Sequence, residues 1–207
     1  MEKFNHIDNS FNDIKDFIDK RLDTTEIREI NRSIEEFNIN KRLDVSNNKE
    51  YPSSLEERKN CACLTNGKWE GDIGNSLCIA NNQEIINSQK EFGIRGINYK
   101  NGIPDFSPIS IAEVKIPDMS EIRHRNFSQA DSLLAAQWNK DMKYGKSDWI
   151  KKDIKEYRHN NHYSWHECND MKTCQLVKTD IHLEYKHLGG VSECKKYYGG
   201  LEGEFDE

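Results

Sequence analysis

The segment Tyr163–Gly190 concentrates the residue types that could hydrolyse a phosphodiester bond. His166 and Glu167 lie close to its beginning, and His182 and His187 lie close to its end. Histidine can act as the base in such a reaction because its ordinary pKa lies near neutrality. Histidine and carboxylate side chains can also bind one divalent ion, Mg²⁺, Mn²⁺ or Zn²⁺. The ion would hold the scissile phosphate and stabilise the leaving oxygen.

The elements that must position these residues are a hairpin and a short helix. Tyr163–Cys168 is short and aromatic, which predicts a strand, and the pair Asn169-Asp170 is typical of a turn. Thr173–Lys178 alternates in polarity and predicts the second strand. The first strand would carry the first histidine and the glutamate.

The helix is predicted to follow the second strand directly. Thr179 or Asp180 can cap its beginning, and Gly189 can end it. On a regular helix His182 and His187 would point about 140° apart, because the helix has about 3.6 residues per turn. Both histidines can therefore bind one ion only if the helix ends before His187. Otherwise His187 would contact phosphate.

Short motifs in this segment resemble the HNH/endonuclease VII superfamily, in particular the toxin nucleases with a Trp-His-Glu or Trp-His-His signature and the colicin-like DNases. The resemblance implies an α+β fold with a ββα metal-binding (HNH-like) core packed on helices. The motifs are Trp165-His166-Glu167, Gln175-Leu176-Val177, Ile181-His182 and His187-Leu188-Gly189-Gly190.

The resemblance implies a role for each polar residue of the segment. His166 would be the general base, and Gln175 would take the position of the family's middle Asn, which orients the base loop. His182 and His187 would serve the metal or the phosphate. Glu167 is a further candidate metal ligand.

The stretch Gly96–Arg125 resembles, more weakly, the lead-in of the same toxins. Asp105, Arg123 and Arg125 are the candidate substrate-binding residues within it. The first 60 residues are not covered by the resemblance.

The function implied is that of a bacterial toxin effector, an endonuclease that hydrolyses phosphodiester bonds in DNA, with RNA also possible. It would need one divalent ion and a cognate immunity protein. It would stay in the cytoplasm of the producing cell until delivery and act in the cytoplasm of the target cell. The N-terminus lacks the apolar stretch of a signal peptide, and no apolar run approaches the roughly 18 residues of a membrane span.

Two alternatives remain open. The histidines and the nearby Cys168, Cys174 and Cys194 could instead be structural ligands in a non-enzymatic, zinc-stabilised binding module. In a different class of nuclease, the PD-(D/E)xK type, two carboxylates hold Mg²⁺ and a lysine steadies the attacking water. Pro104-Asp105 followed by Glu113-Val114-Lys115 fits the short motif of that class.

The chain divides by composition into three parts. Residues 1–60 are expected to form a helical arm over 1–44 and a polar linker over 45–60. Residues 61–196 are expected to form the nuclease domain, with its core at 162–190. Its first part, 61–117, would hold loops and short strands. A helix is predicted over Asn126–Met142, with an inner face of Ala130, Leu133, Leu134, Gln137 and Trp138. Another is predicted over Ser147–Arg158, capped by Ser147 and packed through Trp149, Ile150, Ile154 and Tyr157. Residues 197–207 form an acidic tail.

Charge is distributed unevenly along the chain. The whole chain has a net charge of −6, which argues against nucleic acid as a partner. Residues 95–196, however, carry 17 Lys and Arg against 14 Asp and Glu, and they hold six of the seven histidines. The mildly basic stretch is therefore the part expected to meet nucleic acid. The six cysteines form no C-x-x-C pair and are expected to be reduced thiols.

Overall fold

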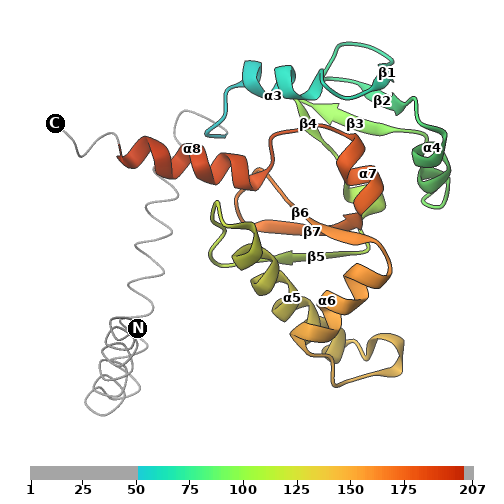
Figure 1. Ribbon diagram of the computed structural model, residues 1–207, viewed down its shortest axis with the longest axis vertical. Helices are drawn as coiled ribbons and strands as arrows, with labels where there is room; N and C mark the ends of the chain where they lie inside the picture. The colour runs from blue at the N-terminus through green and yellow to red at the C-terminus, as the bar shows by residue number, and fades with distance from the viewer. Residues whose placement is uncertain (1–50, 203–207) are drawn as a thin grey trace, which may run out of the picture. The chain divides into compact units, whose positions relative to one another are not determined.

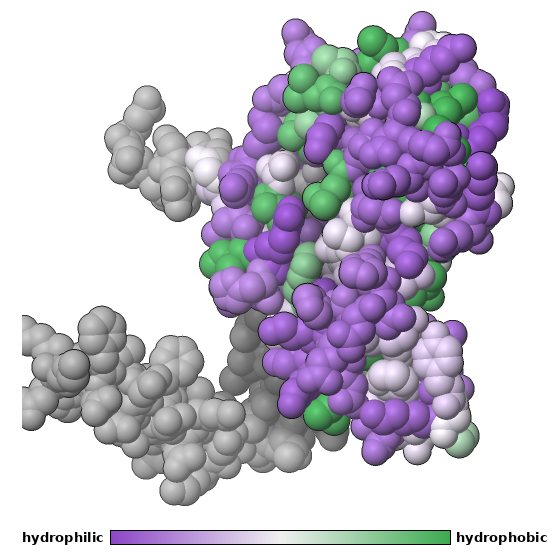
Figure 2. Space-filling model, turned by 45° about the vertical axis from the view of Figure 1, so that its right-hand side comes forward, coloured by the Kyte–Doolittle hydropathy of each residue, from purple (hydrophilic) through white to green (hydrophobic). Residues whose placement is uncertain are grey.

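The computed structural model describes residues 51–202 (Figure 1). The helical arm predicted over 1–44 lies outside the described residues, as do residues 203–207 of the predicted acidic tail. Within the described part, no helix is both long enough and apolar enough to cross a membrane. The face seen in Figure 2 is mainly hydrophilic, with hydrophobic residues in separate spots.

The described residues form helices and two small antiparallel sheets, which confirms the predicted α+β class. The helices are α3 (Leu55–Ala62), α4 (Gln83–Lys90), α5 (Arg123–Lys140), α6 (Lys151–Asn160), α7 (Thr179–Glu184) and α8 (Gly190–Glu202). The strands are β1 (Gly67–Trp69), β2 (Leu77–Ala80), β3 (Ile97–Lys100), β4 (Ile103–Pro104), β5 (Ala112–Lys115), β6 (Tyr163–Glu167) and β7 (Thr173–Lys178). Short 3-10 turns lie at Ser107–Ile109 and Lys143–Gly145.

The predicted hairpin is confirmed, and a third strand joins it. β6 and β7 pair antiparallel, with His166 opposite Gln175, and β5 pairs with the other edge of β7. The remaining strands form a sheet in the order β1-β2-β3-β4. The turn between β6 and β7 is held by Asp170, whose carboxylate accepts hydrogen bonds from the backbone and hydroxyl of Thr173. An aspartate at such a position closes a turn through its own side chain.

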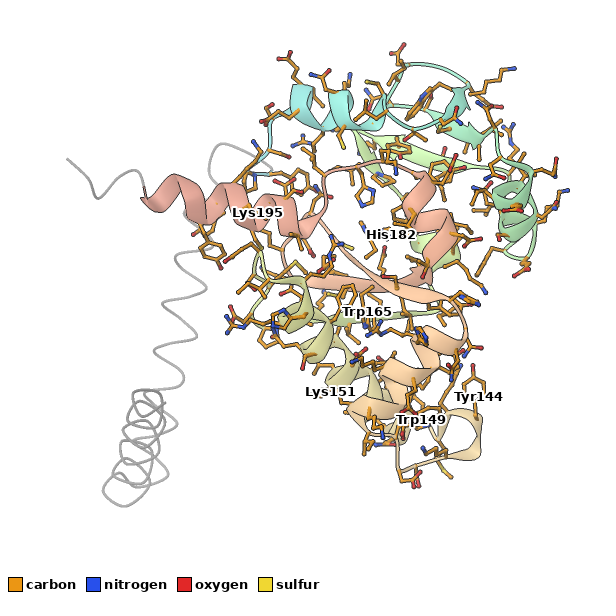
Figure 3. All side chains as sticks on the ribbon, in the orientation of Figure 1. Tyr144, Trp149, Lys151, Trp165, His182 and Lys195 are labelled. Carbon is orange, nitrogen blue, oxygen red and sulfur yellow. The ribbon has the colours of Figure 1, made fainter. Side chains whose placement is uncertain are left out.

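The three-stranded sheet separates two hydrophobic clusters. Side chains alternate between the faces of a strand, so Trp165 and Leu176 lie in the cluster covered by α5 and α6. Val177, Ile181 and Tyr185 lie in the other cluster, toward α7 and the four-stranded sheet. Figure 3 shows Trp165 and His182 on opposite sides of the three-stranded sheet. The candidate chemistry therefore lies on the α7 face.

Helix α5 begins at Arg123, earlier than predicted, and its inner face differs from the prediction. Ala130, Leu134 and Trp138 are buried as expected. The prediction that Leu133 and Gln137 face inward is wrong, because both are exposed.

Asp131 is buried on α5 in their place. Its carboxylate accepts hydrogen bonds from the Arg158 guanidinium at 2.7 and 2.8 Å and from Trp165 Nε1 at 2.8 Å. A periodicity of apolar residues cannot predict a buried acid of this kind.

Helix α6 starts at Lys151 and not at Ser147. The Asp153 carboxylate accepts the hydrogen bond of the Ile150 backbone N–H at 3.2 Å, so Asp153 stabilises the beginning of the helix instead of the predicted cap. Ile154 is fully buried, whereas Ile150 is 58% exposed and not packed inward as expected.

The segment 45–60 is not a linker throughout, because α3 begins inside it at Leu55. Ser54 and Glu57 form a capping box, each side chain accepting the backbone N–H of the other. At the other end, α8 runs through Gly190–Glu202 and so extends into the segment predicted as a tail. The sequence gives little signal for either helix, because α3 has few apolar residues and α8 contains three glycines.

Candidate metal centre

Three histidines from separate elements meet at one point. His166 is on β6, His182 is on α7, and His187 follows α7. One ring nitrogen from each lies within 4.8 Å of the others. The ring centroids are 4.9 to 5.2 Å apart, and His166 Nδ1 lies 3.2 Å from His182 Nε2. Within residues 51–202, this is the group of side chains that could hold a metal ion.

The position at which α7 ends explains how His182 and His187, five residues apart, can reach the same point. The helix stops at Glu184, and Tyr185 has extended backbone angles, φ −88° and ψ 98°. His187 therefore stands on a loop and can reach the same point as His182. The prediction that Gly189 ends this helix is wrong. Tyr185 is fully buried, and its hydroxyl accepts a hydrogen bond from Gln89 Nε2 at 2.7 Å, so tertiary contacts draw the chain out of the helix.

Phe106 packs against all three imidazoles and was missed by the sequence analysis. Its ring is 1% exposed and lies T-shaped to each histidine, with centroids 4.8 Å from His166 and 5.4 Å from His182 and His187. An aromatic ring here gives the imidazoles an apolar wall. No reactive group marks a phenylalanine in a sequence, so its only signal was its place in the weakly resembling stretch 96–125.

The three imidazoles are held neutral by their surroundings. Burial lowers the pKa of His166 well below its usual value, lowers the pKa of His182 to about 3 and lowers that of His187 to about 4. The positive charge of Arg123 lowers all three further. A neutral imidazole has a free lone pair, which is the form that binds a metal ion.

These lowered pKa values predict that the metal-free protein loses stability as the pH falls below 6.5. The unfolded chain has histidines of ordinary pKa near 6.5, so it takes up protons before the folded protein does, and protons then favour unfolding. The stabilisation is complete above pH 6.5 and is lost as the pH falls toward the folded values of about 4 for His187 and about 3 for His182. Denaturant unfolding of the chelator-treated protein between pH 7.5 and 4.5 would measure the loss.

A variant with one titrating ring fewer provides the control for this pH dependence. His187→Gln should show a shallower loss of unfolding free energy over the same range, because glutamine binds no proton. An identical pH dependence in wild type and His187→Gln would contradict the assignment.

Glu167 lies beside the histidine group without belonging to it. Its carboxylate is 3% exposed, accepts a hydrogen bond from Asn126 Nδ2 at 3.2 Å and lies 3.5 Å from Arg123 Nε. Burial raises its pKa, and Arg123 counteracts the shift. Glu167 is the last residue of β6, and it lines the same pocket as His166. The pairing with Arg123 and Asn126 could not be read from the sequence, since α5 lies far from β6 along the chain.

A pocket of about 180 Å³ opens onto the histidines. Besides the three rings it is lined by Glu167, Arg123, Lys186 and the first turn of α8. The Arg123 side chain is 61% exposed, so it is the cation placed between the buried site and solvent. The site thus combines neutral nitrogen donors, one buried acid and cations at its edge.

Gln175 is the register partner of His166, and paired residues share a face of the sheet. Its amide, however, donates to the carboxylate of Glu113 on β5 at 3.1 Å. Gln175 is therefore near the histidines in the sheet but does not line the pocket. Its predicted role in orienting the base loop stays a prediction.

Asp105 and Arg125 are not brought to the pocket. The Asp105 carboxylate accepts the backbone N–H of Ser107 at 2.9 Å and its hydroxyl at 2.6 Å, and Asp105 lines a separate groove with Leu77, Asn98 and Pro108. Arg125 is exposed on α5. Asp105 closes a local turn through these two bonds to Ser107, a common use of aspartate in turns.

Among the described residues, the carboxylates of the PD-(D/E)xK alternative and the cysteines of the zinc-module alternative do not belong to the metal-binding group, whereas the histidines of the zinc module are that group itself. Asp105 holds its own turn and Glu113 pairs with Gln175, so these two carboxylates do not join the described metal-binding group. Cys174 and Cys194 are fully buried in the cluster beneath α5 and α6. In the described part of the chain, no disulfide links any of the six cysteines.

Comparison with known proteins identifies the segment that holds the centre. Residues 96–189 match the family described as the DNase/tRNase domain of colicin-like bacteriocin. No curated protein matches the chain. The matched residues include β3 to α7, with all three histidines, whereas α3, α4 and α8 lie outside them. Residues 96–189 are therefore similar to the DNase/tRNase domains of colicin-like bacteriocins, which are bacteriocin-like toxin nucleases.

Proposed function

We propose that the protein is a metal-dependent endonuclease of the HNH type that hydrolyses phosphodiester bonds in DNA. The observation that carries this proposal is the group of three histidines on a hairpin followed by a helix, inside the colicin-like segment. Three neutral nitrogens within 4.8 Å of one another form a donor set that fits one divalent ion.

His166, His182 and His187 would hold the ion. His187 Nδ1 lies 2.8 Å from the carbonyl oxygen of Tyr185 and can donate to it, which leaves Nε2 for the metal. Three imidazoles favour Zn²⁺ or another transition metal over Mg²⁺, which prefers oxygen ligands. When bound, the ion would polarise the scissile phosphate and stabilise the leaving oxygen.

The proton acceptor is then proposed to be Glu167, in place of His166. His166 is one of the three histidines whose nitrogens converge on the proposed ion. A nitrogen that binds the ion cannot also take a proton from water. Glu167 is the carboxylate that lines the pocket, and burial raises its pKa toward the range useful in a base. Its contacts with Arg123 and Asn126 hold the carboxylate in one orientation.

The substrate is proposed to approach through the cationic edge of the pocket. Arg123 and Lys186 line it, and a phosphate beside them would gain charge-assisted hydrogen bonds. Arg125, exposed on the same first turn of α5, would contact a phosphate further along the strand.

The biological setting is proposed from the family. A nuclease toxin would be made with an immunity protein that blocks the pocket, and would act in the cytoplasm of the cell it enters.

The proposal is tested by assaying cleavage of plasmid DNA and of RNA with Zn²⁺, Mn²⁺ and Mg²⁺ after removal of bound metal. We expect cutting of DNA that depends on the added ion. Protein that leaves both nucleic acids intact with every ion would refute the nuclease assignment. A melting temperature that collapses on chelation, without any cleavage, would support the structural zinc module instead.

Two variants separate the proposed roles of His166 and Glu167. His166→Ala should lose both metal affinity and cleavage, whereas Glu167→Gln should keep the metal affinity and lose cleavage. A His166→Ala protein that binds the ion as tightly as wild type but does not cut would return the role of base to His166.

A further inference from the structure

The loop that carries His187 is held by long-range hydrogen bonds on both sides of that residue. The bonds come from the four-stranded sheet, the segment before it, α4 and the hairpin turn, not from α7 itself. They are Gln89 Nε2 to Tyr185 Oη at 2.7 Å, Lys186 N to Thr65 Oγ1 at 2.9 Å, Tyr99 Oη to Lys186 O at 3.1 Å and Asn169 Nδ2 to Leu188 O at 2.7 Å. The backbone around His187 is therefore set by tertiary contacts.

Asn169 is the tie next to His187 along the chain. It lies in the turn between β6 and β7 and is 4% exposed. Its Nδ2 donates to Leu188 O and to Glu193 Oε1, both at 2.7 Å. Both acceptors face the amide nitrogen, which determines the orientation of the amide. Its Oδ1 has no hydrogen-bond partner within the described residues, so the two donated bonds are what position the side chain.

Glu193 fixes Asn169 from the other side. It lies in the first turn of α8, is fully buried and accepts hydrogen bonds from the backbone N–H of Ser53 at 2.7 Å and from its hydroxyl at 2.6 Å. Arg58 in turn donates to the carbonyl oxygen of Ser53. A buried carboxylate with this many donors is held in one position.

The loop at Gly189 and Gly190 also passes very close to the backbone at the end of β6. A Cβ at Gly190 would lie 2.6 Å from the carbonyl oxygen of Cys168, and one at Gly189 would lie 2.9 Å from that of Glu167. Only glycine lets the loop lie against the end of β6 at this distance. The loop is thus pressed onto the strand that carries His166.

We propose that Asn169 and Glu193 are positioning residues that place His187 for binding the metal. The inference rests on the proposed metal site. The His187 ring is held through Nδ1 by Tyr185 O on one side, and its backbone is held at Leu188 by Asn169 on the other. Ser53 and Glu193 lie outside the matched residues 96–189. The flanking segments of this chain therefore complete the site.

The measurement is the Kd of Zn²⁺ for the full chain, obtained by competition with a chromophoric chelator, together with the melting temperature of the metal-free protein. Asn169→Ala should weaken Zn²⁺ binding by about ten- to a hundredfold, the effect usual for residues that orient a metal ligand. Glu193→Gln should weaken it in the same direction, because the new amide would face the donors of Ser53. If both residues act through one chain of hydrogen bonds, the double variant should bind Zn²⁺ as tightly as the single variant that has the lower Zn²⁺ affinity.

Leu134→Ala is the matched control. Leu134 is fully buried in the cluster on the opposite face of the three-stranded sheet, so its truncation should lower the melting temperature without moving the loop. Its Zn²⁺ Kd, measured where the protein is folded, should stay within about twofold of wild type. If Leu134→Ala lost as much Zn²⁺ affinity as Asn169→Ala, Asn169 would act only by stabilising the fold and not by positioning His187.

The remaining outcomes separate this inference from the proposed function. Wild-type protein that binds no Zn²⁺, Mn²⁺ or Co²⁺ would overturn both. Wild-type binding with an unchanged Kd in folded Asn169→Ala and Glu193→Gln would overturn the positioning role alone. Should Asn169→Ala not fold, Glu193→Gln carries the same test.

Discussion

Replacing His182 or His187 with alanine is expected to lower the rate of DNA cleavage about a thousandfold, since a catalytic metal contributes several kcal/mol to the transition state and about 1.4 kcal/mol is worth a factor of ten. The structure brings one nitrogen of each into the same group as His166, within 4.8 Å. The two losses should therefore be similar, although the residues differ in position relative to α7.

His159→Ala is the matched control for these variants. His159 is exposed in the last turn of α6 and is not a member of the metal group, so its removal should leave the rate within about twofold of wild type, as is usual for surface substitutions. Circular dichroism shows whether each variant is folded, and the Zn²⁺ Kd shows whether it still binds the metal. Near-wild-type cleavage by His187→Ala would remove His187 from the site and favour a centre built on the other two histidines.

Asp131→Ala is expected to destabilise the fold by about 3–5 kcal/mol, the usual effect of breaking a buried ion pair by removing one partner. Asp131 is 3% exposed, and its loss would strand the Arg158 guanidinium and the Trp165 indole N–H without their acceptor. For a chain of this size the midpoint of thermal unfolding should fall by about 6–20 °C. Thermal unfolding of the metal-free protein measures the change.

Glu156→Ala gives the comparison at an exposed ion pair. Glu156 and Lys152 lie 3.8 Å apart on α6 with side chains 59% and 77% exposed, so the pair should contribute no more than about 0.5 kcal/mol. If Asp131→Ala and Glu156→Ala unfold at the same temperature, the buried network behind β6 does not stabilise the protein as inferred. Because Trp165 and His166 face opposite sides of the sheet, folded Asp131→Ala should still bind Zn²⁺.

The prediction of the hairpin from the sequence succeeded because its signals are local. β6 ends one residue before the predicted limit, and β7 begins and ends where predicted. An aromatic strand, an Asn-Asp turn and an alternating strand act over neighbouring residues, and the side chains of Asp170 and Thr173 close the turn themselves. The residue types of the candidate site were recognisable for the same reason.

The failures of prediction lie where distant segments decide the outcome. α7 ends at Glu184 because Tyr185 is buried against Gln89 of α4. Asp105 accepts hydrogen bonds from Ser107 and lines a separate groove, although its neighbour Phe106 packs on the histidines. Neither fact follows from spacing, since helix termination and side-chain partners depend on packing against other elements.

The sequence by itself determined which residue types are available, the hairpin that carries His166, and the order of its histidines along the chain. The tertiary structure alone decided that His182 and His187 meet His166, because the helix must be broken by contacts from α4 and the four-stranded sheet. It also decided that Glu167 pairs with Arg123 and that Phe106 backs the site. Local patterns specify elements, whereas a metal-binding geometry is a property of how those elements pack.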